Sequence, residues 1–414
     1  MKKILITIFL SLIISFEIYP FEVGLNPRFS IAYDRALINN AVFSPDSKIV
    51  ATTEAKKVQL WDAKTGKLLS TVHTYTNKPM FLNFSASGRL LITGAYGGKE
   101  GSPVMVWNVS EKKQVGNLAT MSLVASVAIS PDDTMAAVAG IVQGDNTDAS
   151  ITLWSMKTGK IIATLKKKNV DLYHPQSLLF SKDSKTLLNA VSNKEHGIEI
   201  WDLKTMKLKQ FIPAESDVTE ISLSPDENTL AAGLLIAETK TQNAGGFLRI
   251  FSYPAVNKLY DLKGAKGHIT SLSFHPDGQF LASGAYGSRP NYTIWNLKTK
   301  SAHFQNMNGK RQALKAIFSP DGKSLAVVLN TSGNLGNPDT LQIMDVGSKE
   351  ELQKTGSLND INTFQVGEKV NVIIDGTVYS GEINEKKNGH YLLKMDNRKP
   401  EYWKWVEPGS IRPR

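Results

Sequence analysis

Residue types suited to metal binding and nucleophilic chemistry are sparse in this sequence, which has seven histidines and no cysteine. The histidines are His73, His174, His196, His268, His275, His303 and His390. Their spacing places no two of them together on one helix or hairpin as metal ligands. A Gly-x-Ser-x-Gly turn and a phosphate-binding loop are both missing, and the lack of cysteine excludes thiol catalysis and disulfides. The sequence therefore predicts no enzyme, no metal site and no cofactor.

A second set of side chains has types and spacing that suit binding. Polar residues recur seven positions before the first residue of a repeated turn: Lys78, His174, Asp217, His268 and Gln312. Tyr286 and Arg289 lie in a loop expected on the same side of the molecule, and aromatic and Arg side chains tend to dominate interface energies. These residues are the candidate contact for a peptide or a small polar ligand. Loop variation without any ligand explains them equally well.

The repeated turns are of the Ser-Pro-Asp kind, and each is followed by a short hydrophobic strand. The turns begin at Ser44, Ser85, Ser130, Ser181, Ser224, His275 and Ser319, and the strands end at Trp61, Trp107, Trp154, Trp201, Phe251, Trp295 and Met344. Successive strand ends are 44 to 50 residues apart, close to the period of one four-stranded propeller blade. One such sheet cannot bury both faces alone, so the units must stack until a ring closes. The sequence predicts an all-β fold with a seven-bladed β-propeller over residues 26–346.

The units resemble WD repeats in both of these segments. Phe43 to Lys48, Phe274 to Gln279 and Phe318 to Lys323 follow the Phe-Ser-Pro-Asp-Gly type, and most strands end in Trp-Asp or a close variant. In that family a Gly-His pair opens each repeat, and a His-Asp-Ser/Thr-Trp hydrogen-bond relay joins the strands of each blade. Here the pair Gly267-His268 lies out of register. The resemblance implies a degenerate, bacterial-type WD propeller, and we expect no relay and blades held mainly by apolar packing.

Ring closure follows from the register of the units. The third apolar strand of the first unit starts at Lys67, which is 18 residues before Ser85. Counting the same distance back from Ser44 reaches Asn26, so residues 26–31 are expected to form the outer strand of the last blade. The rival closing segment, residues 350–355, is more charged. A ring sealed by its two ends leaves no long open edge.

The two faces of the ring are expected to differ. Turns rich in lysine share one rim with the Ser-Pro-Asp turns: Lys64, Lys67, Lys112, Lys113, Lys157, Lys160, Lys204, Lys207, Lys298 and Lys300. Because these lysines alternate with aspartates, a solvated rim is favoured over an anion-binding ring, and no nucleic-acid partner is expected. Long polar insertions open on the opposite face, at residues 97–103, 144–150, 238–246, 287–291 and 330–339. Insertions on one side often mark the binding face of a repeat protein.

A different pattern begins after a polar linker at residues 347–362. Residues 363–414 contain two hairpin turns, Asp375-Gly376 and Asn388-Gly389, which predict a small five-stranded β-barrel. The Val-Gly-x-x-Val opening and the aromatic-x-x-Trp-Val end resemble the Tudor, agenet and chromo-barrel group, which often binds methylated cations in an aromatic cage. Two cage positions match, at Tyr379 and Tyr402, whereas Met395 and Arg398 occupy the others, so a broken cage is expected. The aromatics Tyr379, Tyr402, Trp403 and Trp405 form either the domain core or a contact for a peptide or glycan.

The first residues predict export. Lys2 and Lys3 precede an apolar run of 13 residues, Ile4 to Phe16, which is too short to span a bilayer comfortably and is typical of a secretory signal. We therefore expect a signal peptide at residues 1–20 and a periplasmic or cell-envelope location. The alternative is an uncleaved membrane anchor. The formal net charge of +10 favours acidic partners only weakly.

Together these patterns predict a non-enzymatic, exported interaction protein, a monomeric propeller that presents its loop-rich face to a protein or peptide. The small barrel would be a second binding module. The alternative function is that of a periplasmic propeller hydrolase, of the lactonase or peptidase type. For that function Glu220, His174 and His268 are the available polar actors, and they would have to converge within hydrogen-bond reach.

Overall fold

In the computed structural model of the protein, every described helix or strand element is a β-strand. The structure describes residues 24–33, 38–74, 79–95, 102–142, 149–165, 174–192, 196–236, 245–265, 267–287, 290–307, 312–330, 339–347, 369–374, 377–387, 390–395, 404–406 and 411–413. The predicted signal segment and most of the predicted linker lie outside these ranges.

Twenty-seven strands precede the C-terminal segment. They are β1 (Gly24–Tyr33), β2 (Ile38–Phe43), β3 (Ile49–Glu54), β4 (Lys57–Asp62), β5 (Leu68–Thr74), β6 (Pro79–Phe84), β7 (Leu90–Ala95), β8 (Ser102–Asn108), β9 (Lys113–Ile129), β10 (Met135–Val142), β11 (Ala149–Ser155), β12 (Ile161–Leu165), β13 (His174–Phe180), β14 (Thr186–Ser192), β15 (Gly197–Asp202), β16 (Lys207–Pro213), β17 (Asp217–Leu223), β18 (Thr229–Ile236), β19 (Gly245–Ser252), β20 (Lys258–Leu262), β21 (His268–Phe274), β22 (Phe280–Tyr286), β23 (Tyr292–Asn296), β24 (Ser301–Asn306), β25 (Gln312–Phe318), β26 (Ser324–Asn330) and β27 (Asp339–Gly347).

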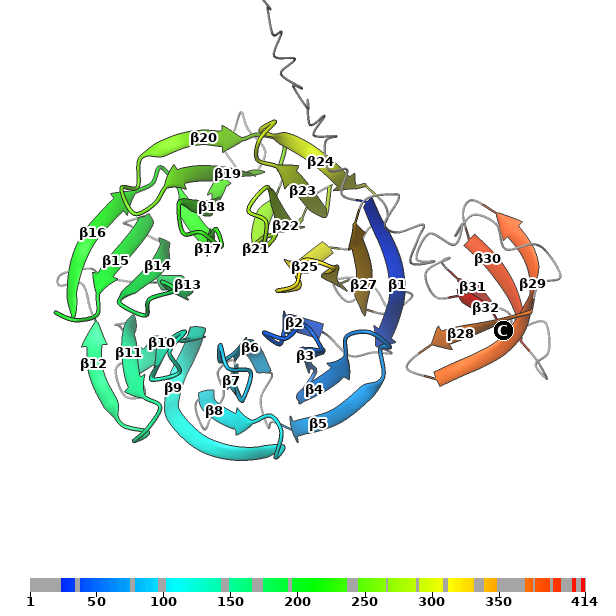
Figure 1. Cartoon of the computed structure of the whole chain (residues 1–414), viewed down its shortest axis with the longest axis horizontal. Coiled ribbons are helices and arrows are strands. Elements are labelled where there is room, and N and C mark those ends of the chain that lie inside the picture. Colours follow the sequence, from blue (N-terminus) through cyan, green and yellow to red (C-terminus); the bar gives the residue numbers. More distant parts are fainter. Residues whose placement is uncertain are drawn as a thin grey trace, which may run out of the picture.

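These strands form seven antiparallel blades around a centre, as Figure 1 shows. Blade 1 consists of β2 to β5, and blades 4, 5 and 6 follow the same order from β13 to β24. Blades 2 and 3 are fused, because β9 is both the outer strand of blade 2 and the inner strand of blade 3, which gives one seven-stranded sheet from β6 to β12. The predicted seven-bladed propeller is confirmed.

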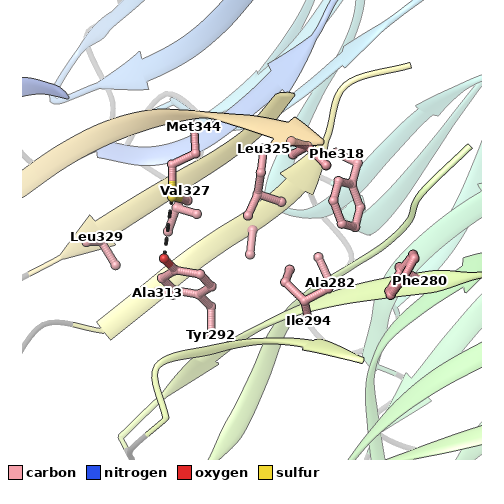
Figure 2. Close-up of a cluster of buried hydrophobic side chains, with 12 residues drawn as sticks. Phe280, Ala282, Tyr292, Ile294, Ala313, Phe318, Leu325, Val327, Leu329 and Met344 are labelled. Carbon is pink, nitrogen blue, oxygen red and sulfur yellow. Dashed lines mark hydrogen bonds between the residues drawn. The ribbon is translucent and has the colours of Figure 1, made fainter. Parts of the chain in front are cut away.

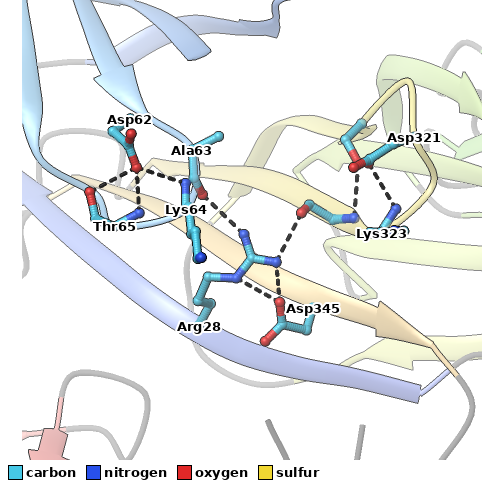
Figure 3. A network of polar contacts seen from close by, with 10 residues as sticks. Arg28, Asp62, Ala63, Lys64, Thr65, Asp321, Lys323 and Asp345 are labelled. Carbon is cyan, nitrogen blue, oxygen red and sulfur yellow. Dashed lines mark hydrogen bonds and ion pairs between the residues drawn. The ribbon is translucent and has the colours of Figure 1, made fainter. Parts of the chain in front are cut away.

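The ring closes through its N-terminal strand. Strand β1 pairs antiparallel with β27 and completes blade 7 in the order β1-β27-β26-β25. Figure 3 shows the polar contacts of this seam, where the Arg28 guanidinium bonds to the Asp345 carboxylate and donates to the Ala63 carbonyl oxygen at 3.0 Å. Phe29 and Ile31 are buried beside it. The predicted closing strand, residues 26–31, is therefore confirmed.

The hydrophobic core lies between neighbouring blades. Figure 2 shows one cluster, in which Phe280 and Ile294 of blade 6 pack against Leu325, Val327 and Met344 of blade 7. Side chains of this size contribute about 1.5–3 kcal/mol each when fully buried. Because each cluster draws on two blades, no blade reaches this stability alone.

Tryptophan hydrogen bonds correct the expectation that no relay joins the strands. The indole N–H of Trp61 donates to the Thr52 hydroxyl at 2.9 Å, and that of Trp295 donates to the Ser283 hydroxyl at 2.8 Å. Trp107 and Thr93 make the same contact in blade 2. The final step of the relay is therefore present in three blades, where a hydroxyl on the second strand satisfies an indole that burial has removed from water.

One rim, which we call the lower rim, carries the Ser-Pro-Asp turns and the turns between the third and fourth strands. In blade 1 the Ser44 hydroxyl donates to the Asp46 carboxylate at 2.6 Å, and the Ala63 amide donates to the Lys48 carbonyl oxygen at 2.8 Å. The second contact joins the two turns of a blade in blades 1 to 6, and in blade 7 the Val346 amide of β27 makes the equivalent bond to the Lys323 carbonyl oxygen. The lysine turns and the Ser-Pro-Asp turns therefore share a rim, as predicted.

The lower-rim turns are also joined from blade to blade. The Asp321 amide of blade 7 donates to the Ser47 hydroxyl of blade 1 at 3.0 Å, and the Asp132 amide of blade 3 donates to the Ser184 hydroxyl of blade 4 at 3.0 Å. Between blades 2 and 3 the Asp133 carboxylate accepts from a backbone amide in the same way. The turn hydroxyls and carboxylates in these contacts are thus engaged within the protein.

The C-terminal segment forms a separate five-stranded antiparallel sheet. Its strands are β28 (Lys369–Ile374), β29 (Thr377–Lys387), β30 (His390–Met395), β31 (Lys404–Val406) and β32 (Ile411–Pro413). Their order is β31-β30-β29-β28-β32, with both predicted hairpins in place. Closure into a barrel and the Tudor-like identity stay predictions.

Candidate functional site

The innermost strand of every blade has one feature in common, a β-bulge near its start. In β17 the pairing with β18 skips from Val218 to Glu220, and in β25 the pairing with β26 skips from Ala313 to Lys315. The same skip occurs in β2, β6, β9, β13 and β21. A bulge bends its strand and re-aims the side chains around it, so the seven inner strands enter the centre of the ring in the same way.

Side chains next to these bulges bind one blade to the next. The Thr219 hydroxyl of blade 5 donates to the Ile269 carbonyl oxygen of blade 6 at 2.9 Å, and the Thr270 hydroxyl donates onward to the Ala313 carbonyl oxygen of blade 7 at 2.6 Å. The side-chain amide of Asn40 links blade 1 to the Met80 carbonyl oxygen at 2.9 Å. The centre is therefore held by polar contacts that the sequence analysis did not foresee.

The predicted mouth residues lie where the inner strands begin. His174, Asp217, His268 and Gln312 are the first residues of β13, β17, β21 and β25. This is the end of the blade opposite the lower rim, which we call the upper face. Lys78 and Arg289, also predicted for this site, lie outside the described residues, as does the side chain of His174.

A carboxylate and two imidazoles gather at blades 4 to 6 of the upper face. His196 Nδ1 lies 2.6 Å from Asp217 Oδ1, and both side chains are about one-third exposed. Asp217 also acts on His268: partial desolvation lowers the pKa of His268, and the negative charge of Asp217 opposes that shift. The structure thus brings together Asp217 and His268 of the predicted site and adds His196.

His196 is the residue that sequence reasoning missed. It was counted among the scattered histidines, because it precedes β15 rather than an inner strand. Its position directly before Gly197 was the available signal: a Cβ on Gly197 would lie 2.2 Å from the Ile212 carbonyl oxygen. The glycine lets the backbone approach that closely, and the Ala214 amide bonds to the His196 carbonyl oxygen at 2.9 Å. These contacts hold His196 beside the loop that carries Asp217.

Tyr286 completes the described part of the site. It is the last residue of β22, pairs directly with His268 across the sheet and is 44% exposed. An exposed Tyr next to an exposed His is suited to stacking and hydrogen bonding. Three predicted residues therefore meet in blades 5 and 6, and Gln312 starts the inner strand of blade 7.

The polar actors of the alternative hydrolase do not share a contact in the described structure. Glu220 Oε1 accepts a hydrogen bond from the Ser177 hydroxyl at 2.7 Å. Burial raises the pKa of Glu220, and the charge of Lys315 opposes this. The charge that acts on His268 is that of Asp217. Since no described contact joins Glu220 to His268, the geometry gives no support to acid-base chemistry by this pair.

The barrel aromatics can be placed only in part. Tyr379 lies in β29 opposite Val372, and Trp405 lies in β31 opposite Leu392. Tyr402 and Trp403 lie outside the described residues. Their predicted role in binding stays a prediction.

Within the described ranges no helix is long and apolar enough to cross a membrane. The same residues contain no group of three or more His, Cys, Asp or Glu side chains that could hold a metal ion.

Comparison with known proteins places the chain among repeat propellers. The family profile described as "WD domain, G-beta repeat" matches residues 257–289. The chain is 25% identical over 252 residues to "Eukaryotic translation initiation factor 3 subunit I" of Bombyx mori, covering 55% of this chain and 69% of the relative. It is 27% identical to "Transducin beta-like protein 3" of Rattus norvegicus over 50% of this chain and 25% of the relative. For "WD repeat-containing protein WDS homolog" of Arabidopsis thaliana the identity is 25%, over 63% of this chain and 44% of the relative.

The match thus spans less than half of the length of two of these three relatives. The matched segment, 257–289, contains the outer strand β20 of blade 5 and the first two strands of blade 6, β21 and β22. It also contains His268 and Tyr286. The strand topology shows a seven-bladed β-propeller, and the profile match shows a WD40 repeat at residues 257–289.

Proposed function

We propose that this protein is an interaction scaffold that binds a protein partner through the upper face of the propeller. The observation that carries the proposal is the group of His196, Asp217, His268 and Tyr286 at blades 4 to 6, which stays partly exposed on the face predicted to bear the long insertions. Similarity to WD-repeat proteins supports a binding role rather than catalysis. Aromatic and charged side chains of this kind dominate the energy of many interfaces.

The contrast with the lower rim supports the choice of face. Lower-rim aspartates and hydroxyls bond within their own turn or to the next one, so a partner would have to displace these bonds. On the upper face the insertions vary in length from blade to blade, which is how repeat scaffolds acquire partners. The proposal therefore assigns binding to the upper face and support to the lower rim.

Site-specific crosslinking tests the face directly. A photo-crosslinking amino acid placed at Tyr286 should give one discrete adduct in living cells. The same amino acid at Thr299, which is exposed on the lower rim of the same blade, should not. A discrete adduct from position 299 and none from 286 would reverse the assignment of the two faces.

Substitutions then test the energy of the contact. Replacing Tyr286 and His268 with Ala should weaken capture of the crosslinked partner by about tenfold or more, as expected for central interface residues. The matched control replaces Lys64, Lys157 and Lys204 of the lower rim, and we expect capture to stay within about twofold. Thermal melting of both variants should match that of the unaltered protein, because all five side chains lie at the surface.

We further propose that the chain is exported and that its C-terminal sheet is a second contact. Export is supported by Lys2, Lys3 and the apolar run Ile4 to Phe16. Cell fractionation should recover a form shortened by roughly 15 to 25 residues, a range set by typical signal lengths. Full-length protein in the soluble cytoplasm would contradict export.

The second contact is tested by truncation. Removing residues 363–414 should weaken partner capture and leave the melting of the propeller unchanged. Because Met395 and Arg398 lack the ring faces that a desolvated cation needs, we expect no selective binding of methylated lysine or arginine peptides. A clear preference for a methylated peptide in titration would show that the cage works.

A further inference from the structure

One layer of the inner strands combines a carboxylate and an ammonium group without joining them. The layer consists of the seven residues that follow the bulges, one from each blade: Asn40, Phe81, Ser126, Ser177, Glu220, Ser271 and Lys315. Because they occupy the same register, they lie at the same depth along the ring axis. Glu220 in blade 5 and Lys315 in blade 7 are the charged members, with Ser271 of blade 6 between them.

Glu220 is held by the protein and yet stays partly exposed. Its Oε1 accepts from the Ser177 hydroxyl at 2.7 Å, and the Ile221 amide also donates to the carboxylate. Glu220 is partly exposed although it belongs to an innermost strand. Its negative charge is therefore within reach of a donor that enters the ring.

Lys315 acts on Glu220 through the electric field of its charge, without direct contact. Its positive charge lowers the pKa of Glu220 against the effect of burial. No ion pair within 4.0 Å joins the two in the described structure, and Lys315 is also partly exposed. Two opposite charges in a confined layer attract strongly when the local dielectric is low, and a molecule that bridges them gains both interactions.

A further member of the layer has an unused acceptor. Asn40 is only 8% exposed, its amide nitrogen donates to the Met80 carbonyl oxygen at 2.9 Å, and its Oδ1 has no hydrogen-bond partner in the protein. A buried acceptor without a partner costs about 1–3 kcal/mol. Water or a ligand donor in this layer would remove that cost.

We propose that this layer binds a small zwitterion, with the ammonium group of the ligand on Glu220 and its carboxylate on Lys315. The chemistry is that of a free amino acid or a similar short molecule. Ser177 fixes the orientation of the Glu220 carboxylate, and Lys315 supplies the charge at the other end. The site lies inside the ring and is distinct from the upper-face residues around Tyr286, so it does not depend on the proposed partner contact.

Calorimetric titration with simple probes tests the pairing of charges. The probes are glycine, β-alanine, γ-aminobutyrate and ε-aminocaproate, which carry the same two groups at increasing separation, with butylamine and butyrate as single-charge controls. At least one zwitterion should bind, and it should bind about tenfold or more tightly than either control. No binding by any of the four zwitterions, or equal binding by butylamine, would overturn the proposal.

Variants that remove one charge at a time test the two charged ends of the proposed site. Glu220→Gln and Lys315→Met keep the size of each side chain and remove its charge, and each should lower the affinity for the best probe by about tenfold or more. Lys323→Met, an exposed lysine on the lower rim of the same blade, should leave it unchanged. Unaltered affinity in both charge variants would refute the site.

Folding of the variants is followed by thermal melting. If Glu220→Gln does not fold, Lys315→Met and the single-charge probes on the unaltered protein still decide the outcome. Loss of Tyr286 should not affect probe binding. Failure of the upper-face contact and failure of this site are therefore distinguishable.

Discussion

The lower rim and the upper face belong to the same blades but use their polar groups differently. On the lower rim the Ser224 hydroxyl donates to Asp226 at 2.6 Å, and the amide of Lys182 in the preceding blade donates to the Glu227 carboxylate. On the upper face, His268 and Tyr286 lie side by side and stay exposed. The serines and aspartates of the repeated turns therefore stabilise the ring, since their side chains already have partners. The irregular face keeps side chains for contacts outside the molecule.

The largest expected effect comes from removing the strand that seals the ring. Deleting residues 22–33 takes away β1, leaves the edge of β27 open and removes the buried side chains Phe29 and Ile31. Each is worth about 1.5–3 kcal/mol, so the melting temperature should fall by about 10 °C or more in differential scanning calorimetry. The single change Arg28→Met should cost about 1–2 kcal/mol, because it removes only the polar contacts of the seam. An unchanged melting curve after the deletion would show that the ring does not need this strand.

A smaller difference in stability between the lower rim and the upper face is expected from alanine substitution at two glycines. Gly322 (φ +73°) and Gly287 (φ +84°) both have left-handed backbones, so alanine strains each by about 1 kcal/mol. A Cβ at Gly322 would also lie 2.7 Å from His275 Nε2, whereas one at Gly287 meets open space. Gly322→Ala should therefore cost about 2–3 kcal/mol in chemical denaturation and Gly287→Ala about 1. Equal costs would mean that the lower rim is not more tightly packed.

Between the two faces, the Trp295 hydrogen bond tests how much the blades depend on polar contacts. Ser283→Ala leaves the indole N–H of a fully buried Trp without its hydroxyl acceptor. A buried donor without a partner costs about 1–3 kcal/mol, and urea denaturation should show a loss in that range. Ser301→Ala, an exposed position in the same blade, is the control and should be neutral. A neutral Ser283→Ala would restore the expectation that apolar packing alone holds the blade.

The smallest expected effects are on the pH dependence of stability. On the lower rim a hydrogen bond lowers a carboxyl pKa, and on the upper face desolvation lowers an imidazole pKa. The hydrogen bond from Ser224 lowers the pKa of Asp226, so its contribution to stability is present above the unfolded pKa near 3.9 and is lost as the pH falls through the folded value. Ser224→Ala should raise the pKa of Asp226 in an NMR titration. An unchanged pKa of Asp226 in this variant would contradict the role given to the Ser224 hydroxyl.

On the upper face the titrating group is His268. Desolvation lowers its pKa, so the folded protein favours the neutral imidazole. Its contribution to stability is full above the unfolded pKa near 6.5 and declines as the pH falls from there toward the folded value. His268→Gln should flatten the stability curve in that window. Steeper pH dependence in the variant would contradict the sign of the shift.

The repeated features were predictable from the sequence and the single ones were not. Seven turns and seven strand ends at a steady spacing determine the number of blades, and the same spacing located the closing strand from Asn26. The fusion of blades 2 and 3 was missed, although residues 113–129 contain no proline and a single glycine, Gly116. A continuous strand through a blade boundary breaks the rule that short strands alternate with turns.

For the candidate site, the sequence predicted only which residues begin the inner strands. Register placed Asp217 and His268 at the upper face, because every inner strand begins at the same distance from its turn. Their link to His196 depends on how the loop before β17 lies against the start of β15. Such contacts between loops leave no periodic signal. The blade-to-blade bonds of Thr219 and Thr270 were missed for the same reason, since they depend on bulges that no local pattern encodes.

The strand that seals the ring is the first to leave the ribosome and the last to find its partner. Strand β1 begins at Gly24, and β27, to which it pairs, ends at Gly347. At roughly 5–20 residues per second, synthesis of the intervening chain takes roughly 15 to 65 seconds. Throughout that time Phe29 and Ile31 have no lasting site of burial. Translation that stops before β27 therefore leaves six blades with an unsealed edge. The ring closes only when the whole propeller has been synthesised.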